Sequence, residues 1–415
     1  MTVLHHVKTL QALVPEYTTR FQCLGSECPD SCCSGWTVSV DRRTHEAYKR
    51  IQDPVLTPLI QKKLERSRAT KSDGAYSRIE LESGNRDCPF LENALCSIQS
   101  RLGEDKLSHT CFQYPRQTKQ VGGVRQQAMT LSCPRAAQLA LDSSDSMEVM
   151  SLPISVRSDS VIKEPLRLQL SPDTLNSVRF ALIRLVRVES APLWQRLASL
   201  AVACEAVQGY IKQGKSADLP VLLGHFEDTL SRGGFSRALD DLRPDYVSQS
   251  VVLGGIWGLQ AFRGGSQIQN RVQTQVTLGL GIKPSAPEGD AALLVQRYQL
   301  GISFLNTTLE QFPWLLTNFV VNEMFRDVFP FGMTSPLEHY RILVMKYGVL
   351  RLMLAARSAY LDRPLAKEEV AETAQVFARH YEHWSGLSTY VEKVLKSAHL
   401  TSTADLYRFL KCTDQ

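Results

Sequence analysis

The chain has 415 residues, of which 43% are hydrophobic and 21% are charged, a composition typical of a folded globular protein rather than a disordered one. The 47 basic and 42 acidic residues give a formal charge of only +5, which is too small to indicate nucleic acid as a partner. A chain of this length can bury a sizeable core and form two domains.

The N-terminal sequence MTVLHHVKTLQALVPEY lacks the continuous apolar stretch of a secretory signal. No later run of about 18 apolar residues could span a bilayer. We therefore expect a cytoplasmic protein without a membrane partner. In that reducing compartment, cysteines grouped in motifs bind metal or take part in chemistry more often than they form structural disulfides.

The cysteines are concentrated near the N-terminus. Eight of the ten lie between Cys23 and Cys133, whereas the rest of the chain holds only Cys204 and Cys412. Residues 1–150 read as short segments punctuated by Gly, Pro, Ser and Asp, with one helical pattern over Thr44 to Ser67. Because such segments offer a poor core, we predict that residues 1–150 form an irregular, Cys-rich domain stabilised by bound metal.

Residues 151–415 are predicted to form a larger helical domain, so the whole fold is expected to be mainly α. Strand-like patches such as Ile154-Ser155-Val156 occur between Leu152 and Leu170, and we interpret that segment as a connection. Apolar residues then recur at helical spacing from Ser171, from Ala191, and over residues 217–231, 291–300, 313–328, 335–360, 366–383 and 387–398.

The segment from Gly233 to Pro287 is rich in glycine, as in GGIWG and LGLG, and has few long periodic stretches. Two interpretations are open. The segment could be a loop region that faces a substrate, or it could simply join helices.

Four of the early cysteines share the segment CLGSECPDSCC, and they are Cys23, Cys28, Cys32 and Cys33. The other four, in CPFLENALC, TCFQYPR and LSCPRAA, are Cys88, Cys96, Cys111 and Cys133. Thiolates are soft ligands that select zinc or iron-sulfur clusters, so we predict that these segments close around a metal centre. The eight thiols could serve one four-iron cluster with spares, two clusters or two zinc sites, and some could be buried and unligated.

These segments resemble proteins with a zinc- or iron-chelating cysteine domain and, more closely, the bacterial flagellin lysine-N-methylase family. The opening YTTRFQC from Tyr17, followed by the first cysteine segment, WTV from Trp36 and Asp41, is similar to that family's first motif. The segments CPFLENALCSIQSRLGEDKLSHTCFQYPR and TLSCPRAAQLAL are similar to its continuation, and VVNEMFRDVFPF with Tyr340 resembles its helical half. The resemblance spans most of the chain and is specific from the N-terminus as far as Ala140.

The resemblance implies methyl transfer from S-adenosylmethionine to lysine side chains of flagellin, with an iron-sulfur cluster of the 4Fe-4S type as the metal centre and zinc as the alternative. The sequence has no GxGxxG pattern next to a predicted strand, so it does not indicate a Rossmann-type cofactor fold. Cys28 and Cys32 match the first spacing of the CxxxCxxC motif of radical S-adenosylmethionine enzymes, but Gly35 stands where the third cysteine is required. We therefore favour a polar displacement at the methyl group.

Six residues near the cysteine motifs are candidates for the reaction site. The catalytic candidates are Tyr17, Asp41 and Tyr114, and the cofactor-binding candidates are Arg20, Trp36 and Arg116. Each has a structural alternative, since an aspartate can cap a helix, a tryptophan can belong to the core, and arginines can brace a loop through salt bridges. His380 and His383 have a spacing that could ligate metal, but we favour solvent exposure for both.

A lysine amine is nucleophilic only when neutral, and its usual pKa near 10.4 keeps it charged at pH 7. An aromatic-lined channel that desolvates the amine and a base or water chain that accepts its proton are therefore expected. Two functions of other classes remain open: a metal-binding or metal-delivery protein whose helical half recognises a partner, and an electron-transfer protein.

Overall fold

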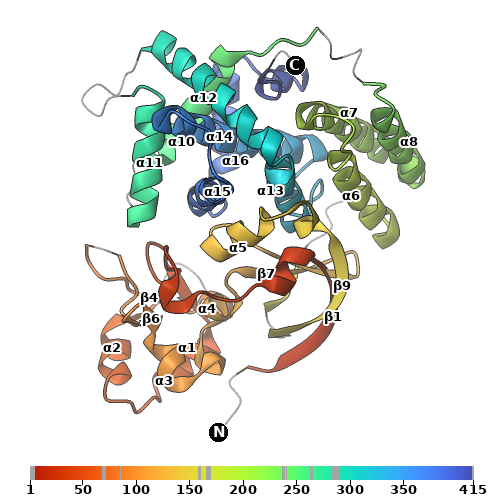
Figure 1. The fold of residues 1–415 in the computed structure, drawn as a ribbon. Helices are drawn as coiled ribbons and strands as arrows, with labels where there is room; N and C mark the ends of the chain where they lie inside the picture. The colour runs from red at the N-terminus through yellow and green to blue at the C-terminus, as the bar shows by residue number, and fades with distance from the viewer. Residues whose placement is uncertain are drawn as a thin grey trace.

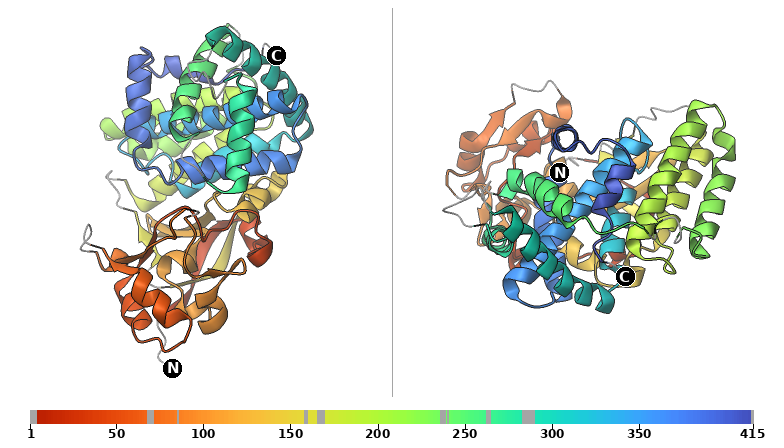
Figure 2. Two further views of the ribbon diagram at one scale, coloured as in Figure 1. Left: turned by 90° about the vertical axis from the view of Figure 1, so that its left-hand side faces the viewer. Right: turned by 90° about the horizontal axis from the view of Figure 1, so that it is seen from above.

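The computed structural model describes residues 5–67, 72–84, 86–157, 160–164, 170–235, 239, 241–261, 265–282 and 290–413. Long helices form the upper part of the molecule in Figure 1, and strands with short helices form the lower, N-terminal part. The side view in Figure 2 shows the same division. The expectation of a mainly helical protein is confirmed.

A five-stranded sheet in the N-terminal part has the strand order β10-β7-β8-β1-β9. Its strands are β1 (Val7–Pro15), β7 (Arg116–Val121), β8 (Val124–Met129), β9 (Val149–Arg157) and β10 (Ile162–Lys163). β1 pairs antiparallel with β9 along its whole length. The prediction of an irregular N-terminal domain is wrong for this sheet, because strands far apart in the sequence satisfy each other's backbone groups. The segment Leu152 to Leu170, interpreted as a connection, contributes most of β9 and all of β10 to this sheet.

The hairpin between β7 and β8 turns at Gly122 and Gly123, whose φ angles are +51° and +79°. A two-residue turn with both φ angles positive matches the right-handed twist of the flanking strands, and glycine adopts it without steric cost. This glycine pair is the local signal that the sequence offered for the sheet.

The described residues between 21 and 115 form a compact unit, called the cysteine module below. Its strands are β2 (Val38–Val40), β3 (Leu64–Arg66), β4 (Ser77–Ile79), β5 (Leu91–Glu92) and β6 (Leu95–Cys96). Its helices are α1 (Arg42–Tyr48), α2 (Leu56–Lys63), α3 (Ser97–Leu102) and α4 (His109–Gln113). The single helix predicted over Thr44 to Ser67 is divided, because Asp53 accepts the N–H groups of Val55 and Leu56 and so starts a second helix. The module buries a small apolar core of its own.

Helix α5 (Pro134–Ala140) lies at the boundary between the two parts. The helices above it are α6 (Pro172–Val186), α7 (Leu193–Lys212), α8 (Leu219–Ser231), α10 (Tyr246–Ala261), α11 (Gln267–Gly279), α12 (Ala291–Gln311), α13 (Trp314–Arg326), α14 (Pro336–Leu361), α15 (Lys367–Tyr381) and α16 (Leu387–Ser397). The loop expected over Gly233 to Pro287 is corrected, since α10 and α11 occupy much of its described part. None of the helices in the described ranges combines the length and apolar character needed to cross a membrane.

The 26-residue helix α14 is the centre of the helical part, and α7, α10, α11 and α12 pack around it. It is buried on nearly all sides, as a helix surrounded by other helices must be. A Cβ atom on Gly279 or Gly301 would lie only 1.8 or 1.9 Å from the carbonyl oxygens of Ala356 and Ala355 in α14. These two glycines therefore permit α11 and α12 to pack closely against α14.

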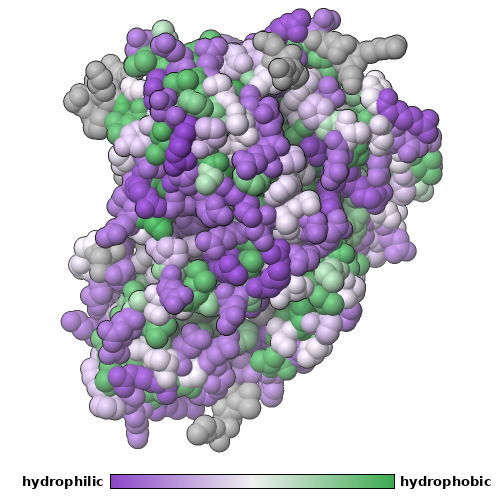
Figure 3. Space-filling view, in the orientation of Figure 1, coloured by the Kyte–Doolittle hydropathy of each residue, from purple (hydrophilic) through white to green (hydrophobic). Residues whose placement is uncertain are grey.

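Helix α13 joins the two parts of the molecule. Asn318 donates hydrogen bonds to the carbonyls of Ala140 (3.0 Å) and Ser143 (2.7 Å), and the Trp314 indole donates to the Leu141 carbonyl (3.1 Å). Buried polar groups are costly unless they are paired, so these bonds fix how the two parts dock. On the face seen in Figure 3, apolar residues form only small groups among hydrophilic ones.

We predict that Gly301→Ala lowers the free energy of unfolding by about 1–3 kcal/mol or more, because its new methyl group overlaps the α14 backbone. Gly258→Ala in α10 is the matched control, since no atom lies within 4 Å of its added Cβ, and it should stabilise the protein by about 0.5–1 kcal/mol. Urea denaturation of both variants measures the difference. Equal effects at the two positions would contradict the packing role.

Candidate metal centre and reaction site

The first cysteine segment is held against the helical part by one buried carboxylate. Asp30 is 1% exposed and accepts hydrogen bonds from the side-chain amides of Gln269 in α11 (3.0 Å) and Gln375 in α15 (2.7 Å). Arg379 lies 3.8 Å from the same carboxylate and donates to the carbonyl of Ser34 (2.6 Å). The loop between Cys28 and Ser34 is thus fixed by two helices from the far end of the chain.

The other cysteines approach this loop from three segments. The Cys88 N–H donates to the Cys33 carbonyl (2.7 Å), Cys96 ends β6, and the Cys111 N–H donates to the Ser108 hydroxyl at the start of α4 (3.3 Å). Cys133 caps α5 immediately before Pro134. All eight early cysteines carry free thiols.

The sulfurs fall into two neighbouring groups. In the inner cysteine group, each thiol influences its partners electrostatically and all four belong to or pack against the core of the cysteine module; its members are Cys33, Cys88, Cys96 and Cys111. The outer cysteine group lies toward α5 and the helical part; its members are Cys23, Cys28, Cys32 and Cys133. Cys32 interacts with Cys33, Cys111 and Cys133, so the two groups adjoin. The sequence did not indicate this division.

Each group contains buried thiols that resist ionisation in the absence of a cation. Burial raises the pKa of Cys111 to about 12 and the pKa of Cys133 to about 11. A hydrogen bond between Cys32 and Cys33 raises the pKa of the first and lowers the pKa of the second to about 7. Because metals bind thiolates, occupation of either group would release protons and convert buried neutral thiols into ligands.

Two aromatic side chains and a histidine form a wall beside the outer cysteine group. The ring of Trp36 lies 5.7 Å from that of Tyr114 and 6.4 Å from that of His383, between centroids. The Trp36 indole donates to the Cys32 carbonyl (2.6 Å), and Tyr114 lies within electrostatic range of Cys133. Figure 1 shows α4, which precedes Tyr114, below α5. His383 is exposed, as predicted, but it belongs to this wall.

A chain of hydrogen bonds leads from the aromatic wall to the interior. The Ser132 hydroxyl lies 3.2 Å from both the Tyr114 hydroxyl and the His383 ring nitrogen, and 2.9 Å from the Thr130 hydroxyl. Thr130 donates to the carboxylate of Glu382. Although part of the His383 ring reaches the surface, desolvation by its neighbours and then the positive charges of Arg326 and Arg379 lower its pKa, so the neutral imidazole is favoured. These hydroxyls, the imidazole and the carboxylate together offer a route for a proton.

Glu382 is itself part of a buried charge cluster at the end of α13. It pairs with Arg326, which also pairs with Glu323 (3.0 Å). The Lys346 ammonium in α14 lies 2.7 Å from Glu323 and 3.0 Å from Asp327. Burial raises the pKa of Glu323 to about 7. Sequence reasoning missed this cluster, although charged residues in the otherwise apolar run VVNEMFRDVF were a signal for it.

The six candidate residues do not all meet at this wall. Trp36 and Tyr114 form it, and Arg116 lies over the Phe21 ring (5.0 Å) within electrostatic range of Cys23 and Cys133. The roles assigned to these residues from the sequence remain predictions.

The other three candidates make contacts elsewhere. Tyr17 is fully buried at the junction of the two parts, where its hydroxyl donates to Asn322 (2.8 Å) and accepts from the Met129 N–H (2.9 Å). Arg20 pairs with Glu16 (2.9 Å) and Asp142 (2.8 Å). Catalytic or cofactor-binding roles for Tyr17 and Arg20 stay predictions, but their contacts are those of bracing residues.

Asp41 caps α1, the alternative considered for it, by accepting from the Thr44 N–H (2.9 Å) and hydroxyl (2.7 Å). It also lies with two histidines. The ligand atoms of His5, Asp41 and His109 lie within 4.8 Å of one another, the one such set of three among the described residues. Burial lowers the pKa of His5 to about 4. The Thr44 hydroxyl bonds His5 as well (2.9 Å), so this set works as a capping network.

We predict that Asp30→Ala lowers the free energy of unfolding by about 1–3 kcal/mol, because the buried amides of Gln269 and Gln375 lose their shared acceptor. It should also speed the reaction of the metal-free protein with a thiol reagent, since the loop around Cys28 loses its anchor. Asp228→Ala, at an exposed position on α8, is the control and should change neither quantity. Unchanged stability and labelling in Asp30→Ala would contradict the anchoring role.

Comparison with known proteins gives the family. The family model described as the FliB lysine N-methylase C-terminal domain matches residues 179–409. A lysine-N-methylase of Salmonella typhimurium is 24% identical over 361 residues, which cover 84% of this chain and 86% of that protein. A second, from Salmonella choleraesuis, is 24% identical over 388 residues, which cover 91% and 93%.

The flagellar biosynthetic protein FliU of Salmonella muenchen is 31% identical over 142 residues, which cover 34% of this chain and 83% of that protein. No solved structure matches the chain. The family model covers more than half of the 415 residues. The chain therefore belongs to the FliB lysine N-methylase family, a family of methyltransferases.

Proposed function

We propose that this protein transfers a methyl group from S-adenosylmethionine to lysine side chains of flagellin, in the cytoplasm before flagellin is exported. The observation that carries the proposal is the meeting of three features: the outer cysteine group, the aromatic wall and the hydrogen-bond chain to Glu382. All three lie where the cysteine module contacts α15 and its C-terminal end. The family favours this enzyme over the metal-delivery and electron-transfer alternatives.

The aromatic wall suits a lysine side chain. The faces of Trp36 and Tyr114 attract a cation and cover the methylene stem, while their partial exposure leaves room for a protein substrate. The amine must lose a proton before it attacks the methyl carbon. The Tyr114 hydroxyl, Ser132 and His383 lie in position to accept that proton and pass it toward Glu382. The remaining barrier falls through alignment of amine, methyl carbon and sulfur.

The outer cysteine group fits an iron-sulfur cluster in its donor chemistry, since it offers four thiols from two segments. A tetrahedral zinc site with Zn–S bonds of about 2.3 Å would bring its sulfurs to about 3.8 Å from one another. Among the described residues, no three cysteine sulfurs lie within 4.8 Å of one another, so the thiols of either group would have to move together to hold a single zinc ion. When bound, a cluster would organise the pocket in which the methyl donor lies.

The inner cysteine group supplies a second set of four thiols. Its place in the core of the cysteine module fits a structural role, with either zinc or a second cluster linking β6, α4 and the first cysteine segment. The N-terminal part thus supplies the metal chemistry, and the helical part supplies the residues that position it.

Anaerobically purified protein should contain iron and acid-labile sulfide, and should transfer label from S-adenosylmethionine to flagellin lysines. Cys23→Ser and Cys133→Ser should lose iron and activity together because each removes an outer ligand. Cys204→Ser, in the core of α7, is the control that should keep its iron. Iron and sulfide analysis with mass spectrometry of flagellin measures both effects. Zinc without sulfide, or no labelled lysine from fully loaded protein, would refute the assignment.

Tyr114→Phe tests the hydrogen-bond chain. It keeps the ring beside Trp36 but removes the hydroxyl next to Ser132, so we expect an unchanged iron content and a kcat lower by on the order of 10-fold or more. Initial rates with flagellin across pH 6–9 measure the effect, with the exposed Tyr360→Phe as control. An unchanged kcat at every pH would remove the Tyr114 hydroxyl from the proton path.

A further inference from the structure

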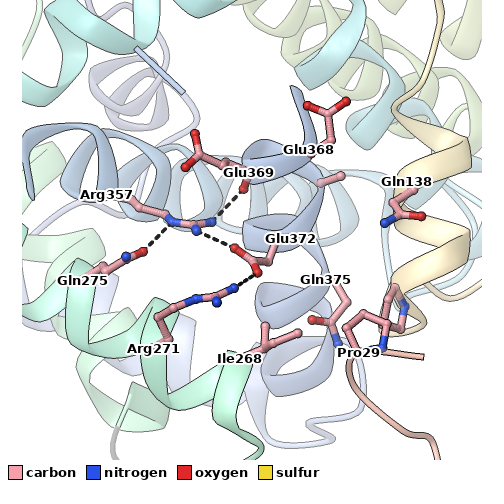
Figure 4. A pocket seen from close by; sticks show the side chains of 12 residues that line it. Pro29, Gln138, Ile268, Arg271, Gln275, Arg357, Glu368, Glu369, Glu372 and Gln375 are labelled. Carbon is pink, nitrogen blue, oxygen red and sulfur yellow. Dashed lines mark hydrogen bonds and ion pairs between the residues drawn. The ribbon is translucent and has the colours of Figure 1, made fainter. Parts of the chain in front are cut away.

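A cavity of about 580 Å³ opens beside the outer cysteine group, between the first cysteine segment and helices α5, α11 and α15. Its wall includes Pro29, which follows Cys28, and Pro134, which follows Cys133. Figure 4 shows Pro29 and Gln138 on one side of the space and the side chains of α11 and α15 on the other. The cavity wall therefore includes the residues that directly follow two of the four outer cysteines, although none of the described cysteines itself lines it.

Charged groups of both signs are fixed on the helical side of the cavity. Arg357, which is 3% exposed, donates to Gln275 (2.7 Å) and Thr373 (3.0 Å) and pairs with Glu372. Arg271 pairs with the same carboxylate, while its side chain stays 55% exposed at the cavity edge. Figure 4 shows Glu372 between the two guanidinium groups. A ligand with its own positive and negative groups would find complementary charges here.

One wall residue links the cavity to the proposed reaction site. The Gln375 amide donates to Asp30 (2.7 Å) and to the Ser132 carbonyl (3.1 Å), so it touches both the cysteine loop and the hydrogen-bond chain. Ile268 and Ala371, together with the two prolines, provide an apolar surface for a flat ring. The cavity volume lies within the usual range of about 300–1,000 Å³ for small-molecule sites.

We propose that this cavity is the S-adenosylmethionine site. The carboxylate of the methionyl group faces Arg271, its ammonium faces Glu368 and Glu372, and the adenine lies against Ile268 and the prolines. The sulfonium then lies at the end of the cavity nearest Cys28 and Cys133. This assignment rests on the proposed function, and it explains how a methyl donor binds a chain without a glycine-rich dinucleotide motif.

The test is calorimetric titration of the metal-loaded protein with S-adenosylhomocysteine, the demethylated product. Gln138→Trp fills the cavity from an exposed position on α5 and should raise Kd at least 10-fold. Arg271→Ala should raise Kd about 5-fold or more, and Arg271→Lys should recover part of the affinity. Arg184→Ala is the matched control, since this arginine is 56% exposed and pairs with Glu227 (3.1 Å) on another helix, and its Kd should stay unchanged.

Iron content and thermal unfolding of every variant show that the fold and the metal centre persist. If the unaltered protein binds S-adenosylhomocysteine and Gln138→Trp binds it equally well, the cavity assignment is overturned while the proposed function stands. If Gln138→Trp keeps this affinity but raises the KM for flagellin, the cavity belongs to the protein substrate. If the loaded, unaltered protein does not bind S-adenosylhomocysteine at all, both proposals fail.

Discussion

A single buried carboxylate, Asp30, determines where the cysteine-rich loop lies. Removing a carboxylate from water is costly unless hydrogen bonds and a counter-charge replace the lost solvation. Gln269, Gln375 and Arg379, from two helices of the other part of the molecule, supply that replacement at Oδ2, whereas the buried Oδ1 accepts no hydrogen bond from a described residue. The loop has little apolar side chain to bury, so this polar anchor takes the place of a core. The outer cysteine group, the aromatic wall and the cavity all lie around it.

Buried polar and charged side chains are found throughout the junction between the two parts. Three carboxylates, those of Glu323, Asp327 and Glu382, meet two cations, Arg326 and Lys346. One negative charge is therefore in excess; burial, and after it the nearby carboxylates of Glu382 and Asp327, raise the pKa of Glu323. A charge cluster that readily takes up a proton lies at the inner end of the chain through Thr130 and Ser132. Such a cluster can take up a proton without placing an unbalanced charge in the interior.

The sequence was sufficient to predict the clustered cysteines, the mainly helical character and most helices after residue 171, because these depend on local spacing. It was not sufficient for the five-stranded sheet, since β1 begins at Val7, its partner β9 begins only at Val149, and neither strand shows a clear alternation. The helices over the glycine-rich segment escaped notice because Gly279 serves a packing contact that only the tertiary structure reveals.

The residues of the candidate site were likewise predicted only where the local sequence pointed to them. Trp36 and Tyr114 were found through their closeness in sequence to the cysteines, whereas Ser132, Glu382 and Glu323 were not. These residues matter through contacts between segments that are far apart in the sequence, such as the hydrogen bond from Thr130 to Glu382. The division of the thiols into two groups likewise depends on how loops fold back on one another.

The anchoring of the first cysteine segment has a consequence for biosynthesis. Cys28 and Cys32 leave the ribosome long before Gln375 and Arg379, which follow them by more than 300 residues in the sequence. Translation adds about 5–20 residues each second, so the nascent thiols wait for many seconds without the partners that orient them. The first cysteine segment therefore reaches its anchored position only after α15 has been made, and any ligand that needs the anchored loop binds after that point.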